Sequence, residues 1–233
     1  MASDDFSRPA RRDALRLILA SMLLPSVSST PAAQTSVQFP GCALTPDQTE
    51  GPYFVDEHLE RSDIRADPTT GALTPGVMLQ LDLGVAAVDA TRCMPLRNAI
   101  VDIWQCDAVG RYSDVDASRG SRFLRGYQVT DANGRVRFTT IYPGAYPGRT
   151  VHIHFKVRRH DQRRNEAFTS QFYFDDALTD RIHAAPAYST AGARRMRNPR
   201  DSLYRDGGNR LTLDVVERDG ALAANYDIGV RVG

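Results

Sequence analysis

The sequence lacks an excess of charge of either sign and lacks a long apolar run. Its 29 Lys and Arg residues nearly balance its 28 Asp and Glu residues, which leaves a formal net charge of +1 over 233 residues. The chain as a whole is therefore not basic, and its charge does not indicate nucleic acid as a partner. The apolar run near the N-terminus, residues 17–24, is far shorter than the ~20 residues that a helix needs to span a bilayer, so we expect no membrane span.

Cysteine is also scarce, and its spacing excludes common metal motifs. The sequence holds three cysteines, Cys42, Cys93 and Cys106, and no Cys-x-x-Cys pair. This spacing does not match a zinc site. One disulfide with one free thiol fits the three residues, and so do three separate buried thiols. The sequence does not choose between these arrangements.

Helical periodicity is rare, whereas short alternating segments bounded by turn residues recur along the chain. Only residues 176–183 have a helical pattern. The Asn133-Gly134 step, which tolerates positive φ, predicts a β-hairpin between residues 126–130 and 135–139. Many evenly spaced short strands predict an all-β fold, a single β-sandwich. The predicted strands are residues 77–85, 99–104, 126–130, 135–139, 150–157, 168–174, 210–216 and 225–232.

The beginning of the chain has the pattern of an export signal. A basic stretch with the pair Arg11-Arg12 precedes the apolar run, and a region of small residues follows it. The paired arginines favour the twin-arginine route, which carries folded proteins, over a general secretory signal or an unstructured tail. We therefore expect residues 1–34 to be an export signal, and residues 35–233 to form one domain of an exported protein, periplasmic or secreted.

Two tyrosines and a His-x-His pair lie close together in the sequence: Tyr112, Tyr146, His152 and His154. Side chains of a strand alternate between its faces, so both histidines leave the same face and can reach one ion. Two phenolate oxygens with two imidazole nitrogens suit a ferric ion, which prefers oxygen donors but accepts histidine. A lone His-x-His in a strand is more often a polar face, but the combination beside a Pro-Gly-rich turn favours a metal site.

These residues belong to a longer run of motifs that resembles the intradiol ring-cleavage dioxygenases. Within that family the chain resembles the protocatechuate 3,4-dioxygenase subunits and their small secreted bacterial relatives. The helical N-terminal domain of the catechol 1,2-dioxygenases has no counterpart here. The matching segments, in order, are the entry segment at residues 45–53, the two tyrosine loops at 102–112 and 141–147, and the histidine strand at 149–155. The resemblance implies a β-sandwich with long loops covering a metal site.

The resemblance also implies a metal and its ligands. Tyr112 and His152 would be the equatorial ligands of a non-haem Fe(III) ion. Tyr146 and His154 would be its axial ligands, and a solvent hydroxide would take the fifth position.

Further residues would act on the substrate according to the same resemblance. Tyr146 would take a proton from it. Arg149 would lie beside the substrate ring and stabilise its anionic character, and Gln171 would line the same pocket. Tyr53 and Glu50 would border that pocket.

The implied activity is cleavage of a catechol-type aromatic diol between its two hydroxylated carbons with O2, which gives a muconate-type diacid. The loop between Tyr146 and His152 is shorter than in the protocatechuate enzymes and lacks their tryptophan, so the sequence does not identify the catechol. By analogy with relatives that assemble from paired sandwiches, we expect a homodimer. Two alternatives remain. A secreted transthyretin-like binding sandwich without iron would leave both tyrosines and both histidines unexplained, and a zinc hydrolase would rarely use tyrosine.

Overall fold

The structure, a computed structural model, describes residues 43–89, 92–159, 167–191, 196–218 and 220–231. The predicted export signal and Cys42 lie outside these residues. Cys93 is disulfide-bonded, so the arrangement with three separate thiols is wrong, and Cys106 is a buried free thiol. Within the described ranges, no helix is long and apolar enough to cross a membrane.

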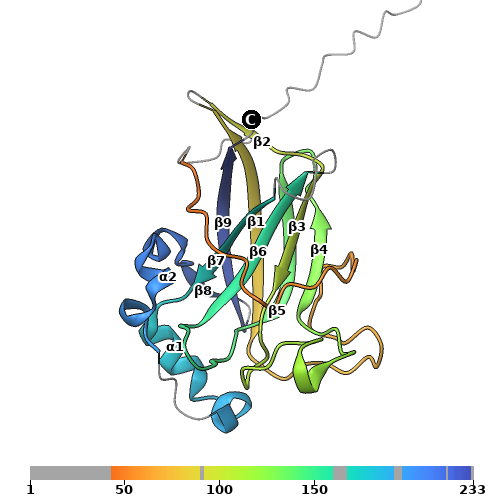
Figure 1. Cartoon of the computed structure of the whole chain (residues 1–233), viewed down its shortest axis with the longest axis vertical. Coiled ribbons are helices and arrows are strands. Elements are labelled where there is room, and N and C mark those ends of the chain that lie inside the picture. The colour runs from red at the N-terminus through yellow and green to blue at the C-terminus, as the bar shows by residue number, and fades with distance from the viewer. Residues whose placement is uncertain (1–42, 90–91, 160–166, 192–195, 219, 232–233) are drawn as a thin grey trace, which may run out of the picture. The chain divides into compact units, whose positions relative to one another are not determined.

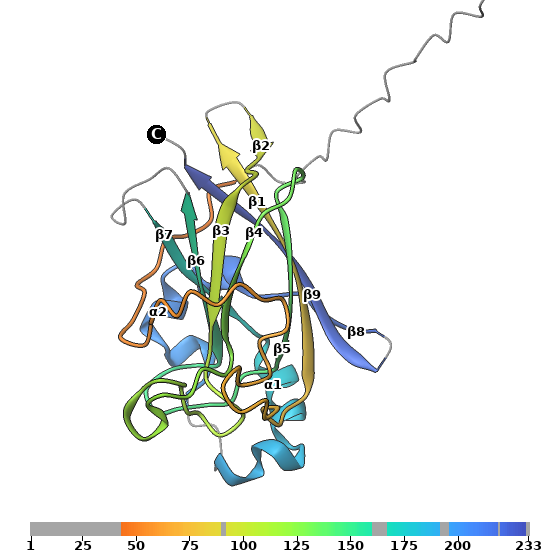
Figure 2. The same cartoon turned by 90° about the vertical axis from the view of Figure 1, so that its right-hand side faces the viewer.

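The strands form two sheets, which Figure 2 shows as two layers. In the four-stranded sheet the order is β4-β3-β6-β7, and all neighbours are antiparallel. In the five-stranded sheet the order is β2-β1-β9-β8, and β5 also pairs with β1. The strands, labelled in Figure 1, are β1 (Met78–Val88), β2 (Cys93–Pro95), β3 (Ala99–Trp104), β4 (Arg125–Val129), β5 (Arg135–Ile141), β6 (His152–Arg159), β7 (Phe168–Tyr173), β8 (Val215–Arg218) and β9 (Ala221–Arg231).

Strand alternation places one face of each sheet in a shared core. Leu79, Leu81 and Leu83 of β1 are buried there, and Ile153 and Phe155 of β6 pack in the same cluster. Full burial of such side chains contributes roughly 1.5–3 kcal/mol each, so the core holds β6 firmly in register. The predicted all-β sandwich is confirmed.

The helices are short, and α1 and α2 lie on the same side of the sheets (Figure 1). Helix α1 (Asp176–His183) matches the predicted helix and begins after Asp175, whose side chain accepts a hydrogen bond from Leu178 N. Helix α2 (Ser202–Arg205), which was not predicted, begins in the same way after Asp201. Short 3-10 helices occur at Asp116–Ser118, Pro186–Ala191, Asn198–Arg200 and Gly208–Leu211.

The predicted hairpin at Asn133-Gly134 is wrong, although its turn exists. Gly134 takes a φ of +71° and its N–H donates to Asp131 O. However, β4 pairs with β3 in one sheet, whereas β5 pairs with β1 in the other. The turn therefore connects the two layers. The strand predicted at residues 210–216 is also mostly wrong, because a 3-10 turn precedes the short β8.

An extended segment before β1, residues 43–60, runs across the outer face of the four-stranded sheet (orange in Figures 1 and 2). The Phe54 ring packs edge-on against Trp104 of β3, with 4.9 Å between centroids. Lys156 of β6 lies over the Phe54 ring and forms an ion pair with Glu50. Because His152 and His154 share this face of β6, the segment covers the predicted metal ligands.

Candidate metal centre

The two tyrosines lie on loops that follow β3 and β5, and the backbones of these loops are in contact. Gly144 N donates to Asp107 O at 3.1 Å. A Cβ on Gly144 would lie 2.4 Å from Asp107 O, and a Cβ on Gly110 would lie 2.3 Å from Ala145 O. Only glycine permits this approach. The glycine two residues before each tyrosine therefore brings the two phenols together.

The four predicted ligands lie in one cluster between these loops and β6. Tyr146 Oη lies 3.0 Å from His152 Nε2, which lies 3.0 Å from His154 Nε2. The ring of Tyr112 lies 5.6 Å from that of Tyr146 and 6.2 Å from that of His154, measured between centroids. Tyr112 Oη is buried and has no hydrogen-bond partner in the described part of the chain. Two phenolic oxygens and two imidazole nitrogens thus lie side by side.

Burial controls the protonation of this cluster. Burial, together with the charge of Arg149, lowers the pKa of His152 to about 3, and burial with His152 lowers the pKa of His154 well below its ordinary value. Burial raises the pKa of Tyr112 well above its ordinary value and that of Tyr146 to about 12. In the absence of a cation, the imidazoles are therefore neutral and the phenols protonated at neutral pH. A cation among them reverses the preference of the phenols.

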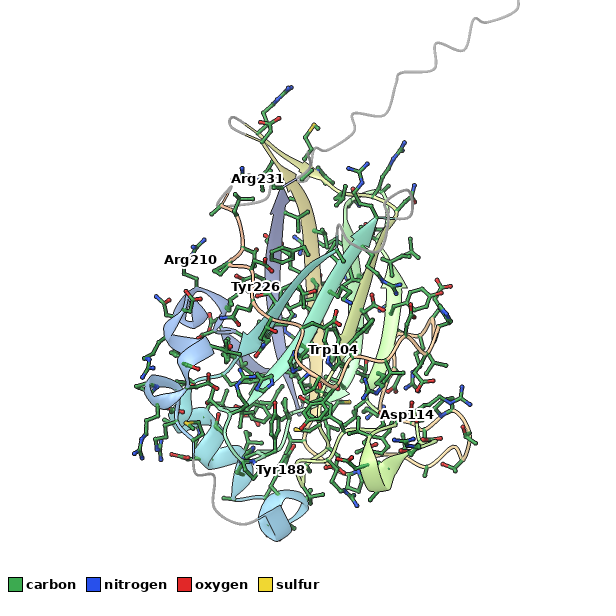
Figure 3. All side chains as sticks on the ribbon, viewed as in Figure 1. Trp104, Asp114, Tyr188, Arg210, Tyr226 and Arg231 are labelled. Carbon is green, nitrogen blue, oxygen red and sulfur yellow. The ribbon has the colours of Figure 1, made fainter. Side chains whose placement is uncertain are left out.

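Groups outside the cluster fix the orientation of both imidazoles. His152 Nδ1 lies 2.6 Å from Thr150 O, and because a carbonyl only accepts, Nδ1 carries the proton and Nε2 the lone pair. The His154 ring stacks on Trp104 (labelled in Figure 3), with 4.9 Å between centroids and an angle of 8°. On its edge lies Gly51, where an added Cβ would come within 3.3 Å of His154 Cε1. A hydrogen bond from the second ring nitrogen, as His152 makes, is typical of metal-binding histidines, whereas His154 Nδ1 is buried without a partner in the described part of the chain.

Arg149 lies next to His152 and donates to three acceptors. Its Nε donates to Asp201 Oδ2 at 2.8 Å, and its Nη2 donates to Gln171 Oε1 at 2.6 Å and to Tyr173 Oη at 3.4 Å. Its Nη1 lies 3.5 Å from His152 Nε2. Burial opposes the charge, but the Asp201 carboxylate keeps the pKa of Arg149 above its ordinary value. Two residues that were predicted to act on the substrate, Arg149 and Gln171, therefore lie together beside the histidines.

A cavity of about 420 Å³ opens beside the tyrosines, and Tyr53, Tyr112 and Tyr146 line it. The Tyr53 ring stacks on that of Tyr112, with 4.5 Å between centroids. Glu50 is not part of this lining, because its carboxylate pairs with Lys156. The structure thus brings Tyr53 to the cavity but not Glu50, and neither Arg149 nor Gln171 is among the lining residues. The other lining residues are Gly110, Arg111, Val115, Asp116, Ala117, Ser118 and Pro147.

Some residues behind the site were missed from the sequence. Asp201 is 2% exposed and holds Arg149. An aspartate before a short helix is an N-cap signal, which could have identified Asp201 as a cap but not as the partner of Arg149. Gln48 accepts a hydrogen bond from Tyr173 Oη at 2.7 Å. Trp104 is buried, and its ring lies on the histidine face of the sheet.

The donor set differs from that of ordinary zinc sites. Within the residues that the structure describes, no group of three or more His, Cys, Asp or Glu side chains is placed to hold an ion. Catalytic zinc takes such ligands in threes. The cluster offers two imidazoles and two phenols, which favours a harder ion such as Fe(III) over zinc.

Comparison with known proteins agrees with the arrangement of these residues. The chain matches a family described as Dioxygenase over residues 49–203, well over half of its length. It is 35% identical over 149 residues to the protein of Burkholderia cepacia named protocatechuate 3,4-dioxygenase beta chain. That match covers 59% of this chain and 58% of the relative, so the chain spans less than two thirds of that relative's length.

Two solved structures are similar as well. The intradiol ring-cleavage dioxygenase from Tetranychus urticae is 31% identical with a TM-score of 0.72, and the match covers 82% of this chain and 95% of that one. The dioxygenase domain of a dioxygenase carbohydrate-binding protein fusion from Streptomyces sp. SirexAA-E is 29% identical with a TM-score of 0.59, covering 82% and 100%. All four predicted ligands lie within the matched region. The chain belongs to the intradiol ring-cleavage dioxygenase family.

Proposed function

We propose that the protein is a non-haem Fe(III) dioxygenase that cleaves a catechol-type ring between its two hydroxylated carbons with O2 and gives a muconate-type diacid. The observation that carries this proposal is the cluster of Tyr146 Oη, His152 Nε2 and His154 Nε2, spaced at 3.0 Å beside the buried hydroxyl of Tyr112. Membership of the intradiol family supports the same chemistry.

The cluster fits a ferric ion in two respects. Tyr146 Oη, His152 Nε2 and His154 Nε2 are close enough together to bind one ion, with 3.0 Å within the pair Tyr146–His152 and within the pair His152–His154. A buried hydroxyl without a partner costs about 1–3 kcal/mol, and coordination by an ion would satisfy that of Tyr112.

The two tyrosines differ in their access to the cavity. A bound ferric ion would supply the Lewis acidity that lowers the pKa of phenols and of a catechol, and would prepare the ring for reaction with O2. Tyr146 is half-buried, whereas Tyr112 is 5% exposed and lies against Tyr53. Tyr146 Oη is therefore the atom that an incoming catechol reaches, and as a phenolate it takes a proton from a catechol hydroxyl.

Arg149 provides a fixed positive charge at the same place. Its Nη1 is the guanidinium nitrogen next to His152 Nε2, at 3.5 Å, while the other two nitrogens are held by Asp201 and Gln171. A charge held in position by its neighbours stabilises negative charge that develops on a bound ring without first having to reorganise. We assign this role to Arg149.

The test is a visible spectrum with metal analysis, before and after anaerobic addition of catechol. Ferric phenolate gives a charge-transfer band, and direct chelation of catechol shifts this band to longer wavelength. When O2 is then admitted, we expect the bound catechol to be converted to a muconate-type diacid. A colourless protein without iron, still colourless after reconstitution with Fe(III), would refute the proposal and favour the binding sandwich without iron.

We also propose that the protein is exported. The pattern of residues 1–34 supports export, and so does the disulfide bond of Cys93, because disulfides persist in oxidising compartments. In cells that express the full chain, replacement of both Arg11 and Arg12 by Lys should retain the protein in the cytoplasm if the twin-arginine route carries it. Unchanged export of this variant would contradict that route.

A further inference from the structure

Asp201 occupies a buried position at the end of α2 that faces the candidate metal centre. It lies between the turn Asn198–Arg200 and α2, and it is 2% exposed. Its contacts reach back to residues 149 and 150, which directly precede β6. The carboxylate thus connects two parts of the chain that are far apart in sequence.

The two carboxylate oxygens of Asp201 have different partners. Oδ1 accepts hydrogen bonds from Leu203 N at 2.8 Å and Tyr204 N at 3.2 Å, which cap α2. Oδ2 accepts hydrogen bonds from Arg149 Nε and from Thr150 N, both at 2.8 Å. Capping a helix requires one side-chain oxygen. The second oxygen is therefore available to the site.

Oδ2 determines which way the guanidinium of Arg149 faces. A guanidinium is planar and rigid, so two anchored nitrogens fix the direction of the third. Asp201 anchors Nε and Gln171 anchors Nη2, at 2.8 Å and 2.6 Å. Nη1 consequently points toward His152 Nε2, 3.5 Å away.

The same oxygen also holds the residue that orients a predicted ligand. Thr150 donates its N–H to Asp201 Oδ2, and its carbonyl accepts the proton of His152 Nδ1 at 2.6 Å. The Thr150 side chain is anchored separately, on Asn198 Oδ1 at 2.6 Å. Asp201 thus restrains the backbone that fixes the tautomer of His152.

We propose that Asp201 is a positioning residue for ring cleavage: through Oδ2 it orients Arg149 Nη1 toward the bound ring and restrains Thr150, which orients His152. This inference rests on the proposed function, because it takes Arg149 to act on the ring. The competing account is that Asp201 serves only as the cap of α2.

A matched pair of variants separates the two accounts. Asp201→Ser keeps a capping oxygen but removes the acceptor of Arg149, since serine is a good N-cap. Asp175→Ser makes the same change at the cap of α1, where the partner is Leu178 N. If Asp201→Ser does not fold, the isosteric Asp201→Asn replaces it.

Kinetics with catechol on the iron-loaded enzymes provide the first measurement. Misplaced catalytic groups cost on the order of 100-fold in rate, so we expect kcat of Asp201→Ser to fall about 10- to 100-fold, and that of Asp175→Ser to stay within about twofold. Arg149→Gln should lose a similar factor. Because the two changes share the guanidinium, the double variant Asp201→Ser/Arg149→Gln should lose clearly less than the product of the two single losses, and what it loses beyond Arg149→Gln should come from the freed Thr150.

A second measurement needs neither iron nor turnover. In the nitrogen–proton NMR spectrum of the metal-free protein, the Nε–H signal of Arg149, identified by its loss in Arg149→Gln, should be protected from exchange in the wild type and in Asp175→Ser. It should shift or exchange rapidly in Asp201→Ser.

Similar kinetics of Asp201→Ser and Asp175→Ser would overturn the inference. So would losses that multiply in the double variant, or an Arg149 signal that does not respond to Asp201→Ser. A wild type without ferric colour and without turnover would instead refute the proposed function, and the NMR comparison would still report whether Asp201 holds Arg149.

Discussion

Replacing Tyr112 by Phe should change stability in opposite directions with and without iron. The Tyr112 ring is 5% exposed and stacks on Tyr53, and phenylalanine keeps this contact. Only the hydroxyl is lost, and it has no hydrogen-bond partner in the described part of the chain. The stability of Tyr112→Phe therefore depends on whether Tyr112 is a metal ligand or a purely structural residue.

The magnitude follows from the cost of the buried hydroxyl. Leaving a polar group unpaired in the interior costs about 1–3 kcal/mol, and this cost disappears in the metal-free Tyr112→Phe protein. For a domain of this size, each kcal/mol shifts Tm by about 2–4 °C. The metal-free variant should therefore melt a few degrees above the metal-free wild type. With Fe(III) the order should reverse, because the variant loses an anionic ligand and with it the stabilisation that binding provides.

Thermal melts followed by circular dichroism, after chelation and after reconstitution with Fe(III), would measure both effects, and the visible band should be lost or strongly shifted. Tyr188→Phe is the matched control. Tyr188 is 2% exposed, but its hydroxyl donates to Tyr142 O at 2.8 Å and accepts from Val77 N at 3.0 Å. Its removal leaves buried groups unpaired, so Tm should fall with and without iron while the band stays unchanged.

One result would refute this reasoning. If metal-free Tyr112→Phe were less stable than the metal-free wild type, the hydroxyl would have a favourable partner in the absence of iron. If the variant also kept its ferric band and activity, Tyr112 would not be a ligand.

Two further predictions concern the same cluster. The pKa of His152 lies at about 3 in the folded protein, below the ordinary value of about 6.5, and that of His154 is also lowered, so the unfolded state binds protons first. Above about pH 6.5 the two histidines should leave the free energy of unfolding of the metal-free protein at its full value. Below that pH, this free energy should fall by up to about 1.4 kcal/mol per pH unit for each histidine. Urea unfolding at pH 7 and at pH 5 measures the fall, and equal free energies at the two pH values would contradict the prediction. Gly110→Ala places a Cβ 2.3 Å from Ala145 O and should lower both Tm and the iron content. The control is Gly120→Ala, which has the same φ of +86° but no atom within 4 Å of the added Cβ, and it should only lower Tm slightly. Identical iron content in the two variants would show that iron binding does not need the close contact between the loops.

Short sequence patterns predicted the structural features that depend only on neighbouring residues. The alternation in β6 and the helical pattern of α1 both depend on neighbouring residues, and both elements are present in the structure as expected. The Asn133-Gly134 turn was also found, but a turn signal does not state which strands pair, and here the two flanking strands enter different sheets. Pairing depends on partners elsewhere in the chain, such as β1, which a local pattern does not contain.

The candidate site divides in the same way. The four donors lie in motifs that the sequence displays, whereas the contact between Arg149 and Asp201 joins positions 52 residues apart and leaves no periodic trace. Glu50 lies in a segment that resembles the family. Its ion pair with Lys156 depends on where this segment crosses β6, which the sequence does not show. Side chains that act through a second residue are visible only once the fold is known.

The segment that covers the histidine face of β6 has a consequence for how the centre is assembled. Gln171 donates to Thr49 O, and Gln48 donates to Leu203 O and Asp206 O, so the segment before β1 meets β7 and the region of α2 behind the ligands. The four ligands lie within residues 112–154, but the groups packed behind them come from residues 48–49 and 203–206. Contacts between such distant positions form late, because long loops must close first. The ability to hold iron should therefore arise only with complete folding, and the colour of the protein would record the yield of correctly folded chains.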